Sequence, residues 1–300
     1  MNWNRGKTLG KGSFGTVSIA KTRHTPGGPH TNLPPLIAVK SAPFLESDSL
    51  WKEKKLLQEL EGCPFIVRCL GKDVTTEKGQ TLYNLLLEYA SGGSLADCIH
   101  SGLPEKIVSH CTRSILSALV HIHSLGYVHS DVKPQNVLVF GSNYEAVKLA
   151  DFGCCKRWKL QEEEEEKCGF RGTLAYAAPE SVHRHKYLPE SDIWALGCTV
   201  VHMLTGRQPW LPEKEKDVMF EIDCRDEILE ISHNIKVSRV AKDFLNKCLI
   251  KDPMVRWKAD MLLNHPFLHK VDDHSPKGRH RLSHRIYSLV PHCFQVEACG

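Results

Sequence analysis

The sequence predicts an α+β, bilobal protein, in which a small antiparallel β-sheet with one main helix is followed by a larger, mainly helical lobe. Residues 3 to about 90 are rich in strand patterns and contain a single helical stretch. From about 94 to 268 helical patterns dominate, interrupted by short apolar strands at 136–140 and 146–151. A run of strands followed by a run of helices is typical of the α+β class.

The composition is that of an ordinary globular protein, with 41% apolar and 25% charged residues in 300. The formal net charge of +4 is too small to indicate nucleic acid or a membrane surface as a partner. The chain lacks a signal-peptide pattern and any apolar stretch of about 18 residues, so we expect no membrane insertion and an intracellular location, in the cytoplasm or nucleus. Its twelve cysteines contain no CxxC pair, which favours reduced thiols over a zinc site.

The first extended stretches surround a glycine-rich motif, LGKGSFGTV at residues 9–17. Its three glycines, Gly10, Gly12 and Gly15, let backbone N–H groups come close to phosphate oxygens. A dinucleotide-binding turn would need a following helix and an acidic residue about 20 positions on, but a strand pattern and prolines follow here. The motif alone therefore leaves open a phosphate-covering hairpin or a hairpin with no ligand. A turn-rich loop is expected at 22–35.

The strand that ends in IAVK carries Lys40, and the next helical stretch offers it a partner. Glu53 lies within the apolar stripe formed by Leu50, Leu57 and Leu60. An acid that faces the core is costly unless it is paired. We therefore expect a Lys40–Glu53 ion pair, against the alternative of an edge lysine that reaches water.

Polar residues cluster after a long amphipathic helix expected at about 105–124. In YVHSDVKPQNVLVF, Asp131, Lys133 and Asn136 lie on a loop that leads into an apolar strand, and Asp151 ends a second short strand. Two acids and an amide at one end of a hairpin suit magnesium, with one carboxylate left for a substrate hydroxyl. A polar turn that merely caps the hairpin would not need all four groups.

These motifs occur in a fixed order that resembles the eukaryotic protein kinases. The series is GKGSFGTV, AVK, a helical Glu, HSDVKPQN, DFG, APE at 178–180, SDIWALGC at 191–198 and DPMVRW at 252–257. It spans about residues 3–268. Lys133 resembles the serine/threonine branch, and MNWNRGKTLGKGSFGTVS, NLLLEYASGGSL and SDIWALGCTVVHMLTGRQPW resemble plant mitogen-activated protein (MAP) kinase kinase kinases of the MEKK-like subgroup.

The resemblance implies ATP and Mg²⁺ as cofactors. The glycines would cover the phosphates, Lys40 oriented by Glu53 would hold the α- and β-phosphates, and Leu87 would be the gatekeeper before the hinge at 88–91. Asp131 would accept the substrate hydroxyl proton, Lys133 would stabilise the transferred phosphoryl group, and Asn136 and Asp151 would ligate magnesium. The full set implied to bind ATP is Leu9, Gly10, Lys11, Gly12, Ser13, Phe14, Gly15, Thr16, Val17, Ala38, Lys40, Leu87, Glu88, Ala90 and Leu138.

The resemblance also implies contacts that support the site. Glu180 and Arg256 would form an ion pair, Asp192 would brace the catalytic loop through its backbone, and Thr173 would pack beside Asp131. A further set, Leu57, His129 and Phe152, would stack as part of an apolar spine between the lobes.

One position departs from the family pattern. Ser130 stands where an arginine usually precedes the catalytic aspartate, and that arginine normally meets a phosphate on the activation segment. The stretch from Gly153 to Gly172 also contains no serine, threonine or tyrosine. We infer that the enzyme is not switched on by phosphorylation in that stretch. Thr173 and Tyr176 remain possible phosphosites, although modification of Thr173 could inhibit.

The same stretch carries five consecutive glutamates, Glu162 to Glu166. They could form a permanent anionic patch that pairs with Lys52, Lys54 and Lys55, or with Arg184, His185 and Lys186; the alternative is a solvated acidic loop. Cys154 and Cys155 follow DFG, and each is either a reactive thiol or simply a small, semi-buried residue.

The sequence therefore predicts a kinase domain at 3–268, with an N-lobe at about 3–88, a hinge at 88–91, a C-lobe at about 92–268, and a polar, flexible tail at 269–300. The expected activity is ATP-dependent serine/threonine phosphorylation of a protein substrate, a MAP kinase kinase. Two alternatives are a nucleotide-binding pseudokinase scaffold and an active kinase outside the MAP kinase cascade. No particular oligomeric state is predicted.

Overall fold

The structure is a computed structural model, and it describes residues 3–12, 15–23, 33–158, 170–209 and 237–269. They belong to one compact unit, Met1–His269. The glutamates Glu162 to Glu166 and the tail from 270 lie outside the described residues. None of the described helices is long and apolar enough to cross a membrane.

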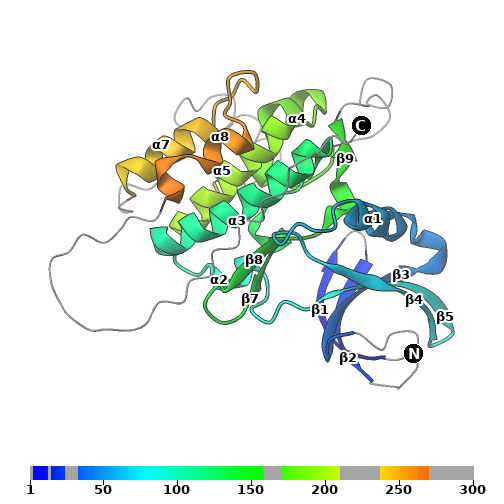
Figure 1. Cartoon of the computed structure of the whole chain (residues 1–300). Coiled ribbons are helices and arrows are strands. Elements are labelled where there is room, and N and C mark those ends of the chain that lie inside the picture. Colours follow the sequence, from blue (N-terminus) through cyan, green and yellow to red (C-terminus); the bar gives the residue numbers. More distant parts are fainter. Residues whose placement is uncertain (1–2, 13–14, 24–32, 159–169, 210–236, 270–300) are drawn as a thin grey trace, which may run out of the picture. The chain divides into compact units, whose positions relative to one another are not determined.

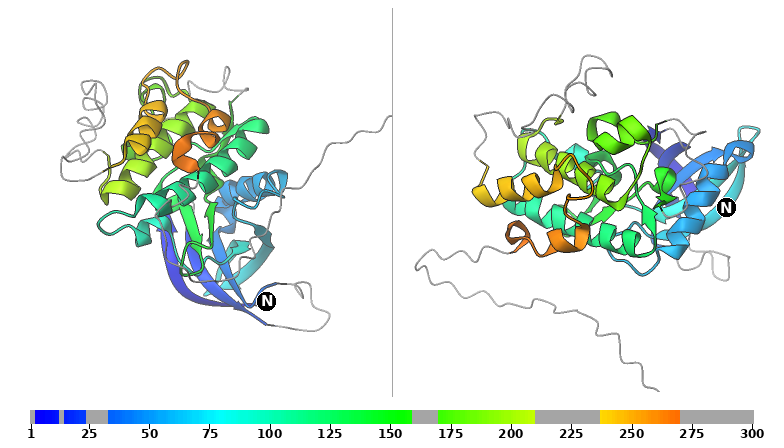
Figure 2. Two further views of the ribbon diagram at one scale, coloured as in Figure 1. Left: turned by 60° about the vertical axis from the view of Figure 1, so that its left-hand side comes forward. Right: turned by 90° about the horizontal axis from the view of Figure 1, so that it is seen from above.

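The N-terminal part is a five-stranded antiparallel sheet with the order β1-β2-β3-β5-β4 (Figure 1). Its strands and the helix that follows β3 are β1 Trp3–Gly12, β2 Gly15–Thr22, β3 Leu36–Pro43, α1 Asp48–Glu59, β4 Cys69–Glu77 and β5 Gln80–Glu88. Figure 2 shows α1 against the sheet from two further directions.

The alternation along β3 explains why both faces of this sheet are covered. Ile37 and Val39 point into a small core around the fully buried Trp3, whereas Ala38 joins the main core with Leu56 and Leu57 of α1. Successive side chains of a strand point to opposite faces. Lys40, two positions after Ala38, therefore points to the same face as α1.

The C-terminal part is built around two long helices that lie side by side, α3 Glu105–Ser124 and α5 Pro189–Thr205 (Figure 1). Helix α3 buries Val108, Cys111, Ile115 and Ile122 on one face. Helix α5 is buried almost all round, as expected of a helix at the centre of a large core. Around them lie α2 Leu95–Cys98, β6 Tyr127–Val128, β7 Val137–Phe140, β8 Ala146–Leu149, β9 Lys156–Arg157, α4 Pro179–Arg184, α7 Arg239–Cys248 and α8 Ala259–Leu263.

The predicted α+β bilobal fold is confirmed, with small differences at the strands beside the site. The strand predicted at 136–140 begins at Val137, because Asn136 closes a 3₁₀ turn that starts at Pro134. The strand predicted at 146–151 ends at Leu149, because Asp151 has a φ of 59° and cannot continue a β-ladder. Both ends therefore turn polar side chains away from the hairpin.

The predicted ion pair of Glu180 and Arg256 is confirmed as a buried, bidentate contact. Arg256 donates to the two carboxylate oxygens of Glu180 at 2.7 and 3.0 Å, and its side chain is 0% exposed. It also donates to the backbone carbonyls of Glu190, Ile250 and Lys251. The pair thus joins α4, the start of α5 and the turn after α7.

Changing Glu180→Gln should lower the free energy of unfolding by about 3 kcal/mol, because the guanidinium of Arg256 stays buried without its countercharge. Chemical denaturation monitored by tryptophan fluorescence measures this. The control is Lys247→Met, which removes an exposed pair with Asp243 at 3.8 Å and should cost less than about 1 kcal/mol. Equal losses in the two variants would contradict the importance of the buried pair.

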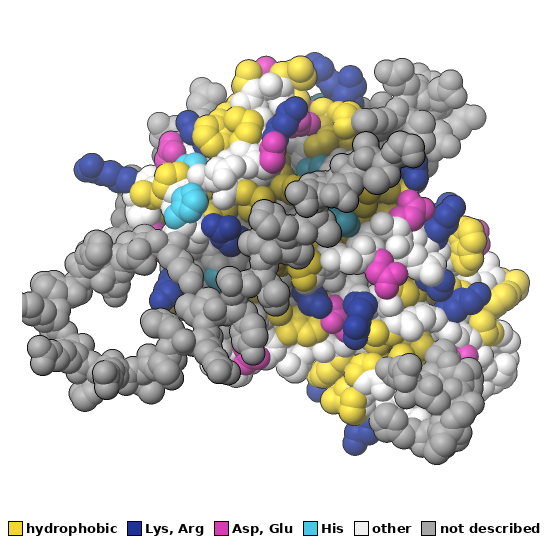
Figure 3. Space-filling model, viewed as in Figure 1, with side chains coloured by type: hydrophobic (Ala, Val, Ile, Leu, Met, Phe, Trp, Pro, Cys, Tyr) yellow, Lys and Arg dark blue, Asp and Glu magenta, His cyan; other side chains and the backbone are white. Residues whose placement is uncertain are grey.

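On the face shown in Figure 3, basic and acidic side chains are interspersed. That distribution matches the small net charge of +4.

Candidate active site

The predicted contact between Lys40 and Glu53 is confirmed. The Lys40 ammonium lies 2.7 Å from Oε2 of Glu53 and 2.8 Å from Oδ1 of Asp151. The Lys40 and Glu53 side chains are 7% and 1% exposed, whereas Asp151 is 38% exposed. One cation therefore joins the sheet, helix α1 and the residue that follows β8.

Burial and charge oppose each other in this cluster. Burial alone would lower the pKa of Lys40, but the carboxylates of Glu53 and Asp151 outweigh burial and raise the pKa. For Asp151, burial would raise the carboxyl pKa, but Lys40 holds the pKa below its ordinary value. Burial raises the pKa of Glu53 despite the opposing charge of Lys40. The Lys40 ammonium therefore stays charged, and its charge favours the ionised form of the buried Glu53 carboxyl.

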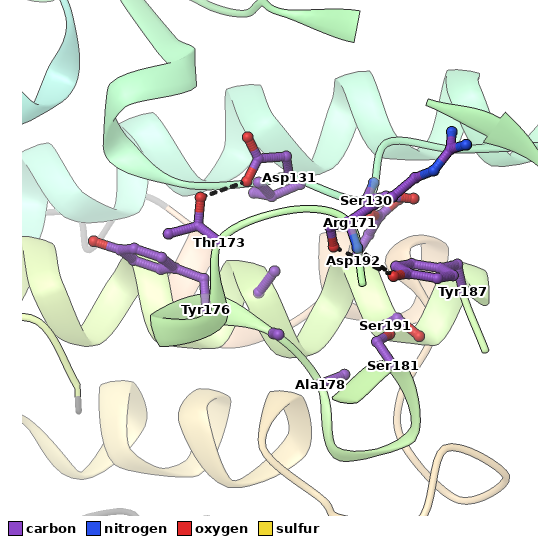
Figure 4. A pocket seen from close by; sticks show the side chains of 13 residues that line it. Ser130, Asp131, Arg171, Thr173, Tyr176, Ala178, Ser181, Tyr187, Ser191 and Asp192 are labelled. Atoms are coloured by element: carbon purple, nitrogen blue, oxygen red, sulfur yellow. Dashed lines mark hydrogen bonds between the residues drawn. The ribbon is translucent and has the colours of Figure 1, made fainter. Parts of the chain in front are cut away.

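Asp131 is held from three sides by residues of the loop and of the segment around Thr173. Its Oδ2 accepts from Lys133 Nζ at 2.7 Å and from Asn136 Nδ2 at 2.8 Å. Its Oδ1 accepts from the Thr173 hydroxyl at 2.8 Å, as Figure 4 shows, and Lys133 donates to the same hydroxyl at 2.6 Å. The predicted place of Thr173 beside Asp131 is thus confirmed.

The backbone of the loop is held by Asp192, as predicted. One carboxylate oxygen accepts the Ser130 N–H at 2.8 Å. The other accepts the His129 N–H at 2.8 Å and the Nε2–H of His123 at 2.9 Å. Ser130 has a φ of 66°, which is strained for a residue other than glycine, so the two backbone bonds stabilise an otherwise unfavourable turn.

The predicted apolar spine is confirmed at its centre. The rings of His129 and Phe152 meet edge to face with centroids 5.0 Å apart, and Leu57 and Phe152 belong to the same buried cluster. His129 Nε2 donates to the Ala150 carbonyl at 3.1 Å, so its tautomer is fixed by the chain that leads to Asp151.

The glycine motif forms the end of the β1–β2 hairpin. Gly10 pairs with Val17 and Gly12 with Gly15, whereas Ser13 and Phe14 lie outside the described residues. Gly15 has a φ of 132°, and a Cβ there would lie 2.4 Å from the Ser41 carbonyl oxygen. No other residue fits that position. Lys11 and Thr16 form the register pair between these two, and Leu9 precedes them, 43% exposed.

The residues implied to hold adenine meet in the main core. Ala38 pairs with Leu87 across β3 and β5, and both are 8% exposed. Val17 and Leu138 are partly buried against the same cluster, which forms an apolar lining. The Glu88 side chain is held by Lys148, which donates to both carboxylate oxygens, at 2.7 and 2.9 Å. Ala90 is buried, 8% exposed, beside it.

Asn136 and Asp151 fit magnesium by the chemistry of their oxygens. The Asn136 amide nitrogen donates to the Asp131 backbone and carboxylate, which leaves its oxygen for another partner. Asp151 uses Oδ1 for Lys40 and Gly153. Proteins usually bind magnesium through one or two such groups, with substrate phosphates and water completing the shell.

The two cysteines after DFG are the small, semi-buried kind. Burial raises the pKa of Cys154 to about 11 and that of Cys155 well above its ordinary value. Since the thiolate is the reactive form, neither residue is an activated nucleophile.

Sequence reasoning missed several residues that support the site. Tyr127 donates to Glu59, and Arg157 donates to the same phenol at 2.9 Å, so the end of α1 is tied to β6 and β9. The ammonium of Lys156 lies over the ring of Tyr187. Their partners are distant in the sequence, so no local pattern could have indicated these contacts.

Comparison with known proteins gives the same result for the fold. The family model described as "Protein kinase domain" matches residues 3–268. The chain is 43% identical to mitogen-activated protein kinase kinase kinase 20 of Arabidopsis thaliana, over 91% of this chain and 81% of that protein. It is 44% identical to kinase kinase kinase 18 of the same plant, over 89% and 78%. A solved structure of Rad53 1-466 in complex with AMP-PNP is similar, with a TM-score of 0.69 and 32% identity over 89% of this chain and 66% of that one.

Changing Lys40→Met should lower the free energy of unfolding by about 3 kcal/mol at pH 8, because Glu53 loses its buried countercharge. Burial raises the Glu53 pKa in the folded state, so the folded protein binds that proton more tightly than the unfolded chain. Stability is therefore lost as pH rises through the folded pKa, and the deficit should shrink by about 1 kcal/mol at pH 5.

The matched control is the double variant Lys40→Met/Glu53→Gln, which has no carboxyl at this position. Chemical denaturation at the two pH values should show the pH-dependent difference only in the single variant. The same difference in both would show that Glu53 is not the titrating group.

Proposed function

The chain belongs to the protein kinase family, and we propose that it transfers phosphate from ATP to serine or threonine of a protein substrate. The observation that carries this proposal is the pair of held carboxylates, Asp131 among Lys133, Asn136 and Thr173, and Asp151 against Lys40. The serine/threonine assignment is supported by Lys133, which follows Asp131 by two residues, and by the kinds of protein the chain resembles.

In this mechanism, Asp131 orients the substrate hydroxyl and accepts its proton as the oxygen–phosphorus bond forms and the bond to the β-phosphate oxygen breaks. Lys133, 2.7 Å from Asp131, places a positive charge beside the transferred group. Lys40 neutralises phosphate charge from the opposite lobe. When bound, Mg²⁺ supplies additional charge neutralisation, and Asn136 and Asp151 are the residues that would hold it.

Two finer assignments rest on similarity alone. The proposed substrate is a MAP kinase kinase, because the similar Arabidopsis proteins bear the name MAP kinase kinase kinase. The proposed location is intracellular, in the cytoplasm or nucleus, since such a substrate has to be met there. The residues proposed to bind ATP and magnesium are those that the resemblance to protein kinases implies.

We further propose that phosphorylation between Gly153 and Gly172 does not switch the enzyme. In place of the family's arginine, Ser130 faces a cavity of only about 20 Å³, with room for about one water. The described part of the segment is held there by protein groups, since Gly172 packs on the Ser130 carbonyl and Thr173 donates to Asp131. Phosphate on Thr173 would remove that hydroxyl donor and place charge beside a carboxylate.

The two alternatives differ in what they require of the site residues. A pseudokinase scaffold would not need Lys40 held against Asp151, or Asp131 held by Lys133 and Asn136. A kinase outside the MAP kinase cascade would keep this chemistry and differ in its substrate surface.

The bacterially expressed protein, treated with phosphatase, should transfer phosphate to a kinase-dead MAP kinase kinase at the rate of the untreated protein. Asp131→Asn should lower this rate by about 10²- to 10⁴-fold, because it removes the proton acceptor. Asp260→Asn, an exposed carboxylate on α8, is the control and should leave the rate unchanged. Radiolabel transfer measures the rate, and intact mass measures the phosphate that the protein carries.

Each outcome has a separate meaning. No transfer by a protein that binds ATP with magnesium would favour the scaffold. Transfer to other proteins but not to MAP kinase kinases would favour the kinase outside the cascade. Loss of transfer after phosphatase would show that the enzyme needs phosphate outside Gly153–Gly172, with Thr173 and Tyr176 as the candidate positions.

A further inference from the structure

Two side chains and one backbone residue that the mechanism does not use meet beside the catalytic loop. Lys156 begins β9, five residues after Asp151; Tyr187 lies in the turn between α4 and α5; and Arg171 stands two residues before Thr173. In the sequence, Lys156 precedes residues 159–169 and Arg171 follows them. Tyr187 contacts both of them.

The contact between Lys156 and Tyr187 is a close cation–π interaction. The ammonium lies 3.7 Å from the centre of the tyrosine ring, and Tyr187 is 3% exposed. A cation over an aromatic face is attracted more strongly when the ring is shielded from water. Other such pairs in the described residues are longer, with Lys148 at 4.9 Å from Phe140 and Lys247 at 5.3 Å from Trp257.

The hydroxyl at the other end of the ring holds the backbone of Arg171. It accepts the Arg171 N–H at 2.7 Å and donates to the Arg171 carbonyl at 3.4 Å. Figure 4 shows Tyr187 beside Arg171, with Ser130 and Asp192 close by. One tyrosine therefore binds a cation with its ring and a backbone residue with its hydroxyl.

The position of Tyr187 is set by the turn that ends α4. His185 takes a left-handed φ of 52°, and the Lys186 carbonyl accepts from the Ser181 hydroxyl at 2.8 Å. The Lys186 N–H donates to the Glu180 carbonyl at 3.2 Å. Glu180 is itself held by Arg256. The ring thus stands on a rigid support.

Arg171 is linked to Asp131 through the two residues that follow it, Gly172 and Thr173. Gly172 follows with a φ of 99°, and a Cβ there would lie 2.5 Å from the Ser130 carbonyl oxygen. The backbone therefore lies directly on the catalytic loop. Thr173 comes next and donates to Asp131.

We propose that Lys156, Tyr187 and the Arg171 backbone form a clasp that positions Thr173 on Asp131. Lys156 and Tyr187 are positioning residues, because they act through Arg171 and do not contact the reacting atoms. The clasp rests on the proposed function and deepens it. In the family pattern, an arginine that binds a phosphate helps to order the activation segment. Here, a lysine that contacts an aromatic ring orders the residues before Thr173.

The test uses variants that remove one part of the clasp at a time. Lys156→Met keeps the length of the side chain without its charge, and Lys156→Arg restores a cation for the ring. Tyr187→Phe keeps the ring without the hydroxyl, and Tyr187→Leu removes both. The matched control is Lys247→Met. Lys247 lies in α7, and its ammonium is 5.3 Å from the centre of the Trp257 ring, farther than Lys156 is from Tyr187.

Lys156→Met and Tyr187→Phe should each lower kcat for a protein substrate by about three- to tenfold, with KM for ATP unchanged. Lys156→Arg should restore most of the rate, and Lys247→Met should match the wild type. In the Tyr187→Leu background, Lys156→Met should have little further effect, since the ring it binds is gone. A loss that is merely structural would not be recovered by arginine.

Hydrogen exchange of the amides from 170 to 176 provides a readout that does not need activity. Exchange should become faster in Lys156→Met and in Tyr187→Phe, and should be unchanged in Lys247→Met. If exchange and kcat in these variants equal those of an active wild type, the clasp is wrong while the proposed function stands. If the wild type transfers no phosphate, the proposed function fails, and unchanged exchange would overturn the clasp separately.

Discussion

The site depends on the hydrogen bonds that the buried carboxylate of Asp192 accepts from the catalytic loop. Asp192 sits in the first turn of α5, the central and almost fully buried helix, so its position is fixed by the main core. Burying a carboxylate is costly unless donors surround it, and here His123 and the amides of His129 and Ser130 do so. The cost of the left-handed turn at Ser130 is offset by these bonds, and the turn gives Asp131 its direction.

A second constraint comes from the other lobe and ends at the same place. Glu53 accepts from Lys40 with one oxygen and from the Phe152 N–H, at 3.2 Å, with the other. The position of α1 is therefore linked to Asp151 by the same side chain that keeps Lys40 charged. Phe152 in turn meets the ring of His129, whose backbone is held by Asp192. Asp131 and Asp151 are thus positioned by one connected set of contacts.

The contacts that could be predicted from the sequence are those that a local pattern makes necessary. Glu53 falls on a core-facing helical stripe, so it needs a cation, and Lys40 at the end of an apolar strand is such a cation. Among the glycines of the hairpin, only Gly15 lacks room for a side chain, whereas a Cβ at Gly10 or Gly12 would meet nothing within 4 Å. The ion pair of Glu180 and the contacts of Asp192 were available only through resemblance to a family.

The contacts that could not be predicted depend on tertiary placement. Tyr187 is 31 positions from Lys156, and Tyr127 is 68 positions from Glu59; neither tyrosine lies in a pattern that points to its partner. The strand predicted at 146–151 from its apolar residues likewise ends at Leu149, because Asp151 takes a left-handed φ that no local pattern indicates. Side chains that act through another residue's backbone, as Tyr187 does on Arg171, have no sequence pattern of their own.

The most direct test of this account is the turnover of an Asp192→Asn variant. An amide offers one accepting oxygen where two backbone N–H groups and an imidazole now donate, so the Ser130 turn should relax. We expect kcat to fall by about 10- to 100-fold with ATP affinity nearly unchanged, while Asp243→Asn, which removes the charge from an exposed carboxylate 2.9 Å from His265, leaves kcat unaltered. Wild-type turnover in Asp192→Asn would contradict the account, because the direction of Asp131 would then not depend on this carboxylate.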